Sequence, residues 1–94
     1  MSLDTVRAEI TRVDAEIVRL IAKRQELAHE IARVKAKEGI PVHYEKRASA
    51  VLKMVFDQAV EKKIDPVAVR NVFLILIAMS EEHQRKCSGK GNLP

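Results

Sequence analysis

Apolar residues recur along the first third of the chain at alternating steps of three and four positions. The series is Leu3, Val6, Ile10, Val13, Ile17, Leu20, Leu27, Ile31 and Val34. This spacing is a heptad pattern, which aligns the side chains along one stripe of an α-helix. Ser2 or Asp4 can cap its start, and the segment 39–41, Gly-Ile-Pro, ends it. The sequence therefore predicts a helix from about Asp4 to Lys37.

Two shorter amphipathic segments follow. The first should run from about Tyr44 to Lys62, with one apolar side formed by Ala48, Val51, Leu52, Val55 and Ala59. The second begins with Asp65 as N-cap and Pro66 at the first helical position, and it fades near Lys86. The residues that it should turn inward are Val69, Val72, Phe73, Leu76 and Ile77.

The 94 residues suffice for one hydrophobic core, so we expect one all-α domain over 1–87 and a disordered tail over 88–94. The first predicted helix extends roughly 50 Å, whereas a compact domain of this size is about 30 Å across. Its apolar stripe is covered only if another chain packs on the overhanging half. We therefore predict a three-helix protomer, one helix long and two shorter, intertwined with a second copy as a homodimeric helical bundle. An extended monomeric coiled-coil arm is the alternative.

Composition narrows the partner and the location. Lysine and arginine number 17 and aspartate and glutamate 13, and the net charge of +4 favours an anionic partner. Cys87 is the only cysteine, so we expect no disulfide, no cysteine-based zinc cluster and a reducing compartment. The N-terminus resembles neither a signal peptide nor a membrane span. These features predict a cytoplasmic protein without membrane contact.

Two cations interrupt or extend the apolar stripe of the first helix. Arg24 occupies a heptad position that should be apolar, and Lys35, 11 residues later, returns to within about 20° of the same direction. The two cations should share one groove, unless Glu26 or Glu30 is a structural partner of Arg24. Arg7 lies about 100° away around the axis and should serve a different groove, that of a partner chain.

Polar side chains also replace apolar ones near the end of the third helix. Ser80 and Gln84, one turn apart, continue its apolar stripe, although Gln84 could be a helix-end residue that faces water. Arg47, near the start of the second helix, adds a third cation. Cations with amide and hydroxyl groups in an apolar bundle are typical of a pocket for a small dianion.

No motif for covalent or metal chemistry accompanies these groups. There is no Ser-His-Asp order, no glycine-rich phosphate loop and no pair of histidines at i, i+4 spacing. We therefore expect neither a metal nor a cofactor. The histidines are interpreted as ordinary side chains: His29, His43 and His83.

With these residues in place, the chain resembles the all-α class of chorismate mutases in its short, monofunctional form. The resemblance covers about Leu3 to Lys86. It rests on Val6-Arg7-Ala8-Glu9-Ile10, Lys23-Arg24-Gln25-Glu26-Leu27-Ala28, Val34-Lys35, Ile40-Pro41-Val42 followed by Arg47, and Ser80 with Gln84. It implies an entwined dimer of three-helix protomers and the rearrangement of chorismate to prephenate in aromatic amino-acid biosynthesis, without a cofactor.

The resemblance also implies roles. Arg7 matches an arginine that crosses to the partner's site, where it and Arg24 would clamp the substrate carboxylates. Lys35 and Gln84 would donate hydrogen bonds to the ether oxygen, where negative charge grows during the reaction. The other matched substrate-binding positions are Arg47 and Ser80.

Two positions at the expected substrate site depart from the family pattern. Many members have a glutamate after the second-helix arginine and an aspartate three residues before that arginine, where this chain has Ala48 and Tyr44. Ala48 cannot accept a hydrogen bond from the ring hydroxyl, and Glu45, one turn earlier, could substitute. The isochorismate pyruvate-lyases of salicylate synthesis share the fold and can lack that glutamate, so they are the alternative in the same fold.

A function from another class also fits a small basic helical dimer, namely non-catalytic binding of nucleic acid or protein. Groove-reading proteins need an exposed basic cluster on a recognition helix. The third predicted helix is apolar at its centre and mixed in charge at its end. We therefore expect a small dianionic substrate and no nucleic acid.

Overall fold

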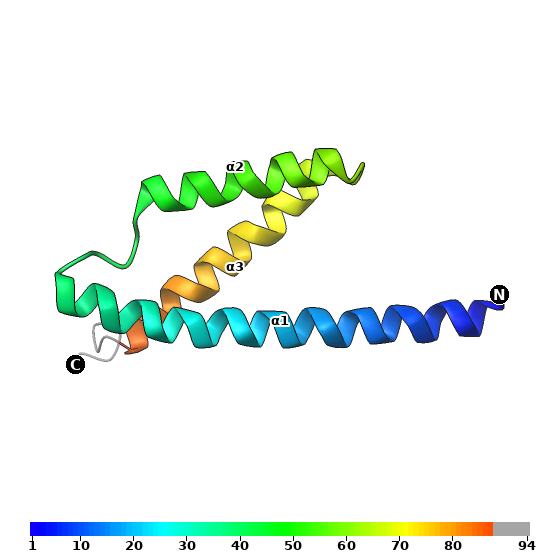
Figure 1. Ribbon diagram of the computed structural model, residues 1–94, viewed down its shortest axis with the longest axis horizontal. Coiled ribbons are helices and arrows are strands. Elements are labelled where there is room, and N and C mark those ends of the chain that lie inside the picture. Colours follow the sequence, from blue (N-terminus) through cyan, green and yellow to red (C-terminus); the bar gives the residue numbers. More distant parts are fainter. Residues whose placement is uncertain (88–94) are drawn as a thin grey trace.

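The computed structural model describes residues 1–87, and its regular structure is helical throughout (Figure 1). Helix α1 spans Leu3–Glu38, α2 spans Glu45–Glu61 and α3 spans Pro66–Cys87. Residues 1–87 contain no strand, and none of their helices is both long and apolar enough to span a bilayer. The predicted all-α protomer is confirmed. The predicted tail, 88–94, lies outside the described residues, so the division into a domain and a tail stays a prediction.

The helix ends follow local signals. Ser2 rather than Asp4 caps α1, because its Oγ accepts a hydrogen bond from a first-turn backbone N–H at 3.1 Å. The helix stops at Gly39, whose left-handed backbone (φ 71°) suits a residue without Cβ. Tyr44 has extended backbone and precedes α2 as its N-cap. Asp65 caps α3 as predicted, and its Oδ1 accepts backbone N–H bonds at 3.0 and 3.2 Å.

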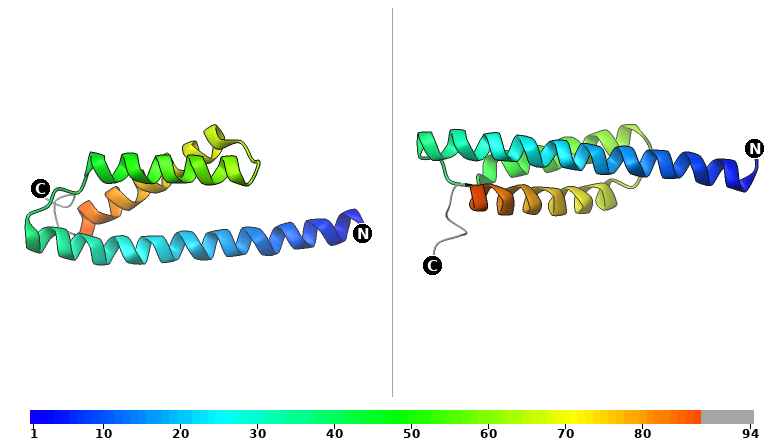
Figure 2. Two further views of the ribbon diagram at one scale, coloured as in Figure 1. Left: turned by 45° about the horizontal axis from the view of Figure 1, so that its top comes forward. Right: turned by 90° about the horizontal axis from the view of Figure 1, so that it is seen from below.

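Helix α3 packs on both other helices, whereas α1 and α2 do not pack on each other within the described residues (Figures 1 and 2). It begins beside the C-terminal end of α2 and crosses to the C-terminal half of α1. The buried core consists of small and β-branched side chains: Ala28, Ala32, Val51, Val55 and Ala59. One inward prediction for α3 is wrong for the single chain, because Val72 is 53% exposed. Helix α3 is therefore the element that links α1 to α2.

The N-terminal half of α1 is exposed, and its first turns project beyond the other two helices (Figure 1). The chain extends over 54 × 25 × 20 Å, and its radius of gyration of 16.5 Å exceeds the roughly 12 Å of a compact chain of this length. The apolar residues of this half are exposed: Leu3, Val6, Ile10, Val13, Ile17 and Leu20. One protomer alone therefore leaves the predicted apolar stripe uncovered.

Candidate active site

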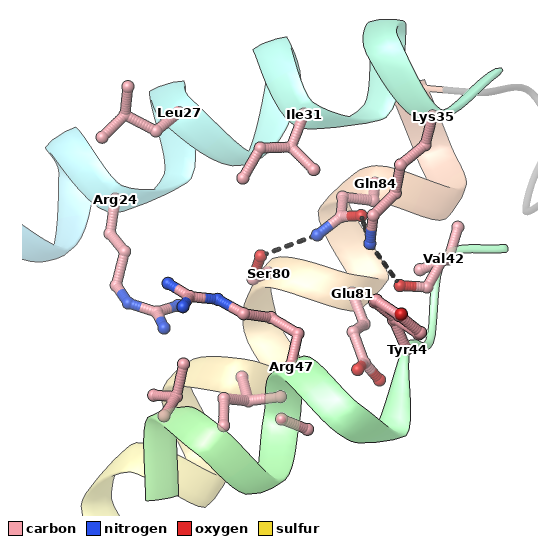
Figure 3. Close-up of a pocket in the computed structure, with 13 residues that line it drawn as sticks. Arg24, Leu27, Ile31, Lys35, Val42, Tyr44, Arg47, Ser80, Glu81 and Gln84 are labelled. Atoms are coloured by element: carbon pink, nitrogen blue, oxygen red, sulfur yellow. Dashed lines mark hydrogen bonds between the residues drawn. The ribbon is translucent and has the colours of Figure 1, made fainter. Parts of the chain in front are cut away.

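A pocket of about 280 Å³ opens where the three helices face one another (Figure 3). Its walls are mostly apolar, with a few polar groups among them, as is typical of small-molecule sites. Seven of the eight predicted site residues line it: Arg24, Lys35, Tyr44, Arg47, Ala48, Ser80 and Gln84. The fold thus brings together residues from α1, α2, α3 and the loop before α2, and their roles stay predictions.

Lys35, Gln84 and Ser80 form a chain of hydrogen bonds on one side of the pocket. The Nζ of Lys35 donates to the backbone oxygen of Val42 at 2.6 Å and to Oε1 of Gln84 at 3.0 Å (Figure 3). The Nε2 of Gln84 donates to Oγ of Ser80, one turn earlier, at 2.9 Å. Gln84 is only 4% exposed, so it is not a helix-end residue that faces water.

These hydrogen bonds fix the orientation of the Gln84 amide. A lysine ammonium only donates hydrogen bonds, so Oε1 must face Lys35 and Nε2 must face Ser80. The ammonium carries three N–H groups and the amide nitrogen two. Each group therefore keeps one N–H for a ligand.

Burial also affects the charge of Lys35. Desolvation lowers the pKa of Lys35 below the ordinary lysine value of 10.5, and the nearby Glu81 carboxylate opposes this by favouring the charged form. In its charged form, the ammonium can stabilise negative charge in the pocket.

Two guanidinium groups face each other across the pocket. Arg24 comes from α1 and Arg47 from α2 (Figure 3). Arg24 Nη1 donates to the backbone oxygen of Leu76 at 3.2 Å. Desolvation, and secondly the positive charge of Arg47, lower the pKa of Arg24. Two cations that destabilise each other in a partly buried site favour an anion between them.

The alternative that an acid of α1 neutralises Arg24 is wrong. Glu26 Oε2 lies 3.5 Å from Nζ of Lys23, and Glu30 Oε2 lies 3.7 Å from Nη1 of Arg33. In the described part of the chain, no carboxylate pairs with Arg24. The guanidinium is thus available to a ligand.

The sequence did not identify Glu81, the one carboxylate that lines the pocket among the described residues. Its Oε2 is 2.7 Å from Nδ1 of His43, whose Nε2 is 2.9 Å from Oε2 of Glu45. Glu45, the substitute suggested by the sequence, does not line the pocket, and its side chain is 78% exposed. Glu81 could have been found from its position three residues before Gln84, which places both on one helix face.

Arg7 is the predicted residue that the pocket of its own chain does not include. It lies 17 residues before Arg24 on the same helix, which corresponds to roughly 25 Å along the axis. No arginine side chain spans that distance. Its assignment to a partner's pocket stays a prediction.

Residues 6–85, most of the chain, match a family described as "Chorismate mutase type II". The chain belongs to this family. The resemblance inferred from the sequence is thereby confirmed, and all eight predicted site residues fall within the matched range.

Individual relatives in the family include short and long proteins. A chorismate mutase from Methanocaldococcus jannaschii is 29% identical over 84 residues, which cover 89% of this chain and 85% of that protein. A bifunctional chorismate mutase/prephenate dehydratase from Aquifex aeolicus is 36% identical over 56% of this chain but only 15% of its own length. The T-protein of Haemophilus influenzae is 37% identical over 54% of this chain and 14% of its own.

Proposed function

We propose that this protein is a chorismate mutase, an isomerase that converts chorismate to prephenate in aromatic amino-acid biosynthesis. Membership of the family supports the reaction. The observation that carries the proposal for this chain is the convergence of Lys35, Gln84 and two arginines in one pocket of small-molecule size, where within residues 1–87 no carboxylate forms an ion pair with either arginine. The predicted location in the cytoplasm rests on the single cysteine and stays a prediction.

The reaction is a concerted rearrangement, in which the ether C–O bond breaks while a C–C bond forms between the enolpyruvyl chain and the ring. It needs no covalent catalyst, so the protein must bind the reactive shape and stabilise charge on the ether oxygen. A pocket with fixed hydrogen-bond donors suits this task. The donors act without reorganisation because their geometry is set before the substrate binds.

Lys35 and Gln84 are the donors that we assign to the ether oxygen. Each has one N–H to spare after the hydrogen bonds to Val42, Ser80 and each other. Both groups line the same pocket, so their remaining N–H groups can converge on one oxygen. As the C–O bond breaks and the oxygen becomes more negative, both bonds strengthen, so they lower the barrier rather than only binding the substrate.

Arg24 and Arg47 are assigned to the substrate carboxylates. Both guanidinium groups project into the pocket from opposite walls, and Arg24 has no carboxylate partner there. A guanidinium binds a carboxylate through two parallel N–H bonds, which fixes the orientation of the bound group. The two carboxylates of chorismate would thus hold the side chain over the ring.

We further propose a homodimer in which the partner subunit's Arg7 completes this clamp. The exposed apolar stripe on the N-terminal half of α1 supports this arrangement, because such a long stripe is unfavourable in water. A second copy packed there would bury the stripe and bring its own Arg7 toward a foreign pocket. In this assembly each pocket contains residues of both chains.

Glu81 takes the role that the family gives to a glutamate at the position of Ala48. Its carboxylate lines the pocket and is mostly buried, so it can accept a hydrogen bond from the ring hydroxyl of chorismate. Ala48 and Tyr44 line the same pocket without offering a carboxylate there. Because Ala48 also suits isochorismate, the isochorismate lyase activity is a second reaction to test.

The test is to offer purified protein chorismate and isochorismate separately and to follow prephenate, pyruvate and salicylate. We expect prephenate from chorismate, and loss of that activity in the Lys35→Ala variant. The exposed Lys53, which is bonded to Asp57 on α2, gives a matched control, and Lys53→Ala should stay active. If the protein converts isochorismate but not chorismate, the lyase is favoured. If it converts neither substrate and binds duplex nucleic acid with a strong salt dependence, the non-catalytic alternative is favoured.

A further inference from the structure

Away from the pocket, three metal-ligand side chains converge at the end of α3. His83 and Cys87 lie one turn apart on α3, and His29 meets them from α1. Nδ1 of His29 is 2.9 Å from Sγ of Cys87, which is 3.6 Å from Nε2 of His83. The ligand atoms of all three lie within 4.8 Å of one another, and none of the residues lines the substrate pocket.

The two separations to Sγ of Cys87 can be compared with those around a tetrahedral zinc ion. Zinc bonds of about 2.0–2.1 Å to nitrogen and 2.3 Å to sulfur place the two ligand atoms about 3.6 Å apart. The His83–Cys87 separation already has this value, and the His29–Cys87 separation would lengthen by roughly 0.7 Å. Imidazole and thiolate ligands also bind zinc in preference to magnesium and calcium.

The surroundings admit an ion. His29 is exposed, and both His83 and Cys87 are half-buried. An open hollow of about 560 Å³, lined by His29 and His83, lies beside the cluster. Glu26 and Glu30 line the same hollow, each within ion-pair distance of a cation of α1, so their charges are balanced and do not oppose a bound cation.

We propose that His29, His83 and Cys87 form a site for one zinc ion, with water in the fourth position. On binding, the Cys87 thiol proton passes to solvent, and two metal–ligand bonds replace the hydrogen bond between Nδ1 of His29 and Sγ of Cys87. The ion ties the last turn of α3 to α1. Gln84 lies between the two α3 ligands, so the ion also steadies the helix that positions this donor.

This site departs from the expectation of no metal. The sequence has no two histidines at i, i+4 spacing, but α3 carries a histidine and a cysteine at that spacing. The third ligand is 58 residues from Cys87 in sequence, and only the crossing of α1 and α3 brings it there. The proposal does not depend on the chorismate mutase activity, because its test measures metal binding.

The test is titration of the metal-free, reduced protein with Zn²⁺ by calorimetry, and with Co²⁺ by absorption spectroscopy. We expect one ion per chain, a higher melting temperature with Zn²⁺, and a thiolate-to-cobalt charge-transfer band. Cys87→Ser should remove the charge-transfer band. Loss of a residue that only supports a metal ligand typically weakens metal binding by roughly 10–100-fold. His29→Ala removes a ligand itself, so we expect it to weaken Zn²⁺ binding by at least that factor. His43→Ala is the matched control, and it should bind Zn²⁺ as the parent does.

Circular dichroism serves to check that each variant keeps its helices. The two substitutions lie on different helices, so a folding defect in one variant leaves the other informative. The proposal is overturned if a folded Cys87→Ser or His29→Ala variant binds Zn²⁺ with the parent's affinity. One ion per two chains also overturns it, because the three ligands belong to one chain.

Discussion

The Nζ of Lys35 donates a hydrogen bond to Oε1 of Gln84 at 3.0 Å, although 49 residues separate the two in sequence. This bond joins the last turn of α1 to the last turn of α3 inside the pocket. It orients the Gln84 amide and holds the Lys35 ammonium beside it, so that both can donate to the same ligand atom. The pair is thus the part of the site whose geometry decides the proposed reaction.

Loss of either donor should reduce turnover by about a hundredfold. Removing one preorganised donor to a developing oxyanion commonly costs about 3 kcal/mol of transition-state stabilisation. We expect this loss in kcat for both Lys35→Ala and Gln84→Ala, measured as initial rates of chorismate consumption. Near-parental kcat in either variant, with its melting temperature unchanged, would show that the donor is assigned wrongly.

The pH dependence of activity should reveal the protonation of Lys35. Burial lowers the pKa of Lys35 below 10.5, and deprotonation removes both the positive charge and the third N–H that the ether oxygen would use. We therefore expect kcat/KM to fall as the pH rises through this lowered value. Arginine stays protonated over the same range, so Lys35→Arg should have a lower but flat alkaline profile. An alkaline fall of the same shape in both proteins would assign it to another group.

His43 should make stability depend on pH. Its hydrogen bonds, first to Glu81 and then to Glu45, raise the pKa of His43 above 6.5. A pKa that is higher in the folded state than in the unfolded state stabilises the fold. This contribution is fully present at a pH below the unfolded-state pKa, and it is lost as the pH rises through the folded-state pKa. Below pH 6.5, the melting temperature of the parent should exceed that of His43→Ala. The difference between the two melting temperatures should narrow at a pH above the raised pKa of His43. The effect is small, because the histidine is exposed.

A mixture of two inactive variants should regain activity if the partner subunit's Arg7 completes each pocket. The Arg7→Ala variant keeps Lys35 in its own pocket but cannot supply the arginine to its partner. The Lys35→Ala variant supplies the arginine but lacks Lys35 in its own pocket. Refolding them together forms mixed dimers in which one pocket is complete, giving roughly a quarter of parental activity. Each variant refolded alone is the control. A mixture no more active than its parts, or a monomeric protein in sedimentation, would exclude the shared site.

Glu81 and Glu45 offer a matched pair for the ring hydroxyl. Both carboxylates bond to His43, but only Glu81 lines the pocket. Glu81→Ala should raise the KM for chorismate roughly five- to tenfold, the loss of one hydrogen bond, and Glu45→Ala should leave it near the parental value. If Glu81 acted only as a repelling charge near a dianion, its removal would lower KM instead. The direction of the change therefore decides its role.

The site could be predicted from the sequence wherever it depends on one helix alone. Arg24 and Lys35 share the pocket because 11 residues of α-helix return to nearly the same direction, whatever surrounds the helix. Ser80 and Gln84 lie one turn apart for the same reason. The polar character of these positions in apolar stripes was visible without any tertiary information.

What the sequence by itself determined was the set of helices, their ends and the directions of side chains around each axis, because hydrogen bonds and caps within a helix involve residues close in sequence. The crossing of α3 over α1, at the small Ala28 and Ala32, was decided only in the tertiary structure. That crossing pairs Lys35 with Gln84 and brings His29 to Cys87. Such contacts depend on how side chains of different helices interlock, and no pattern along one segment encodes that packing.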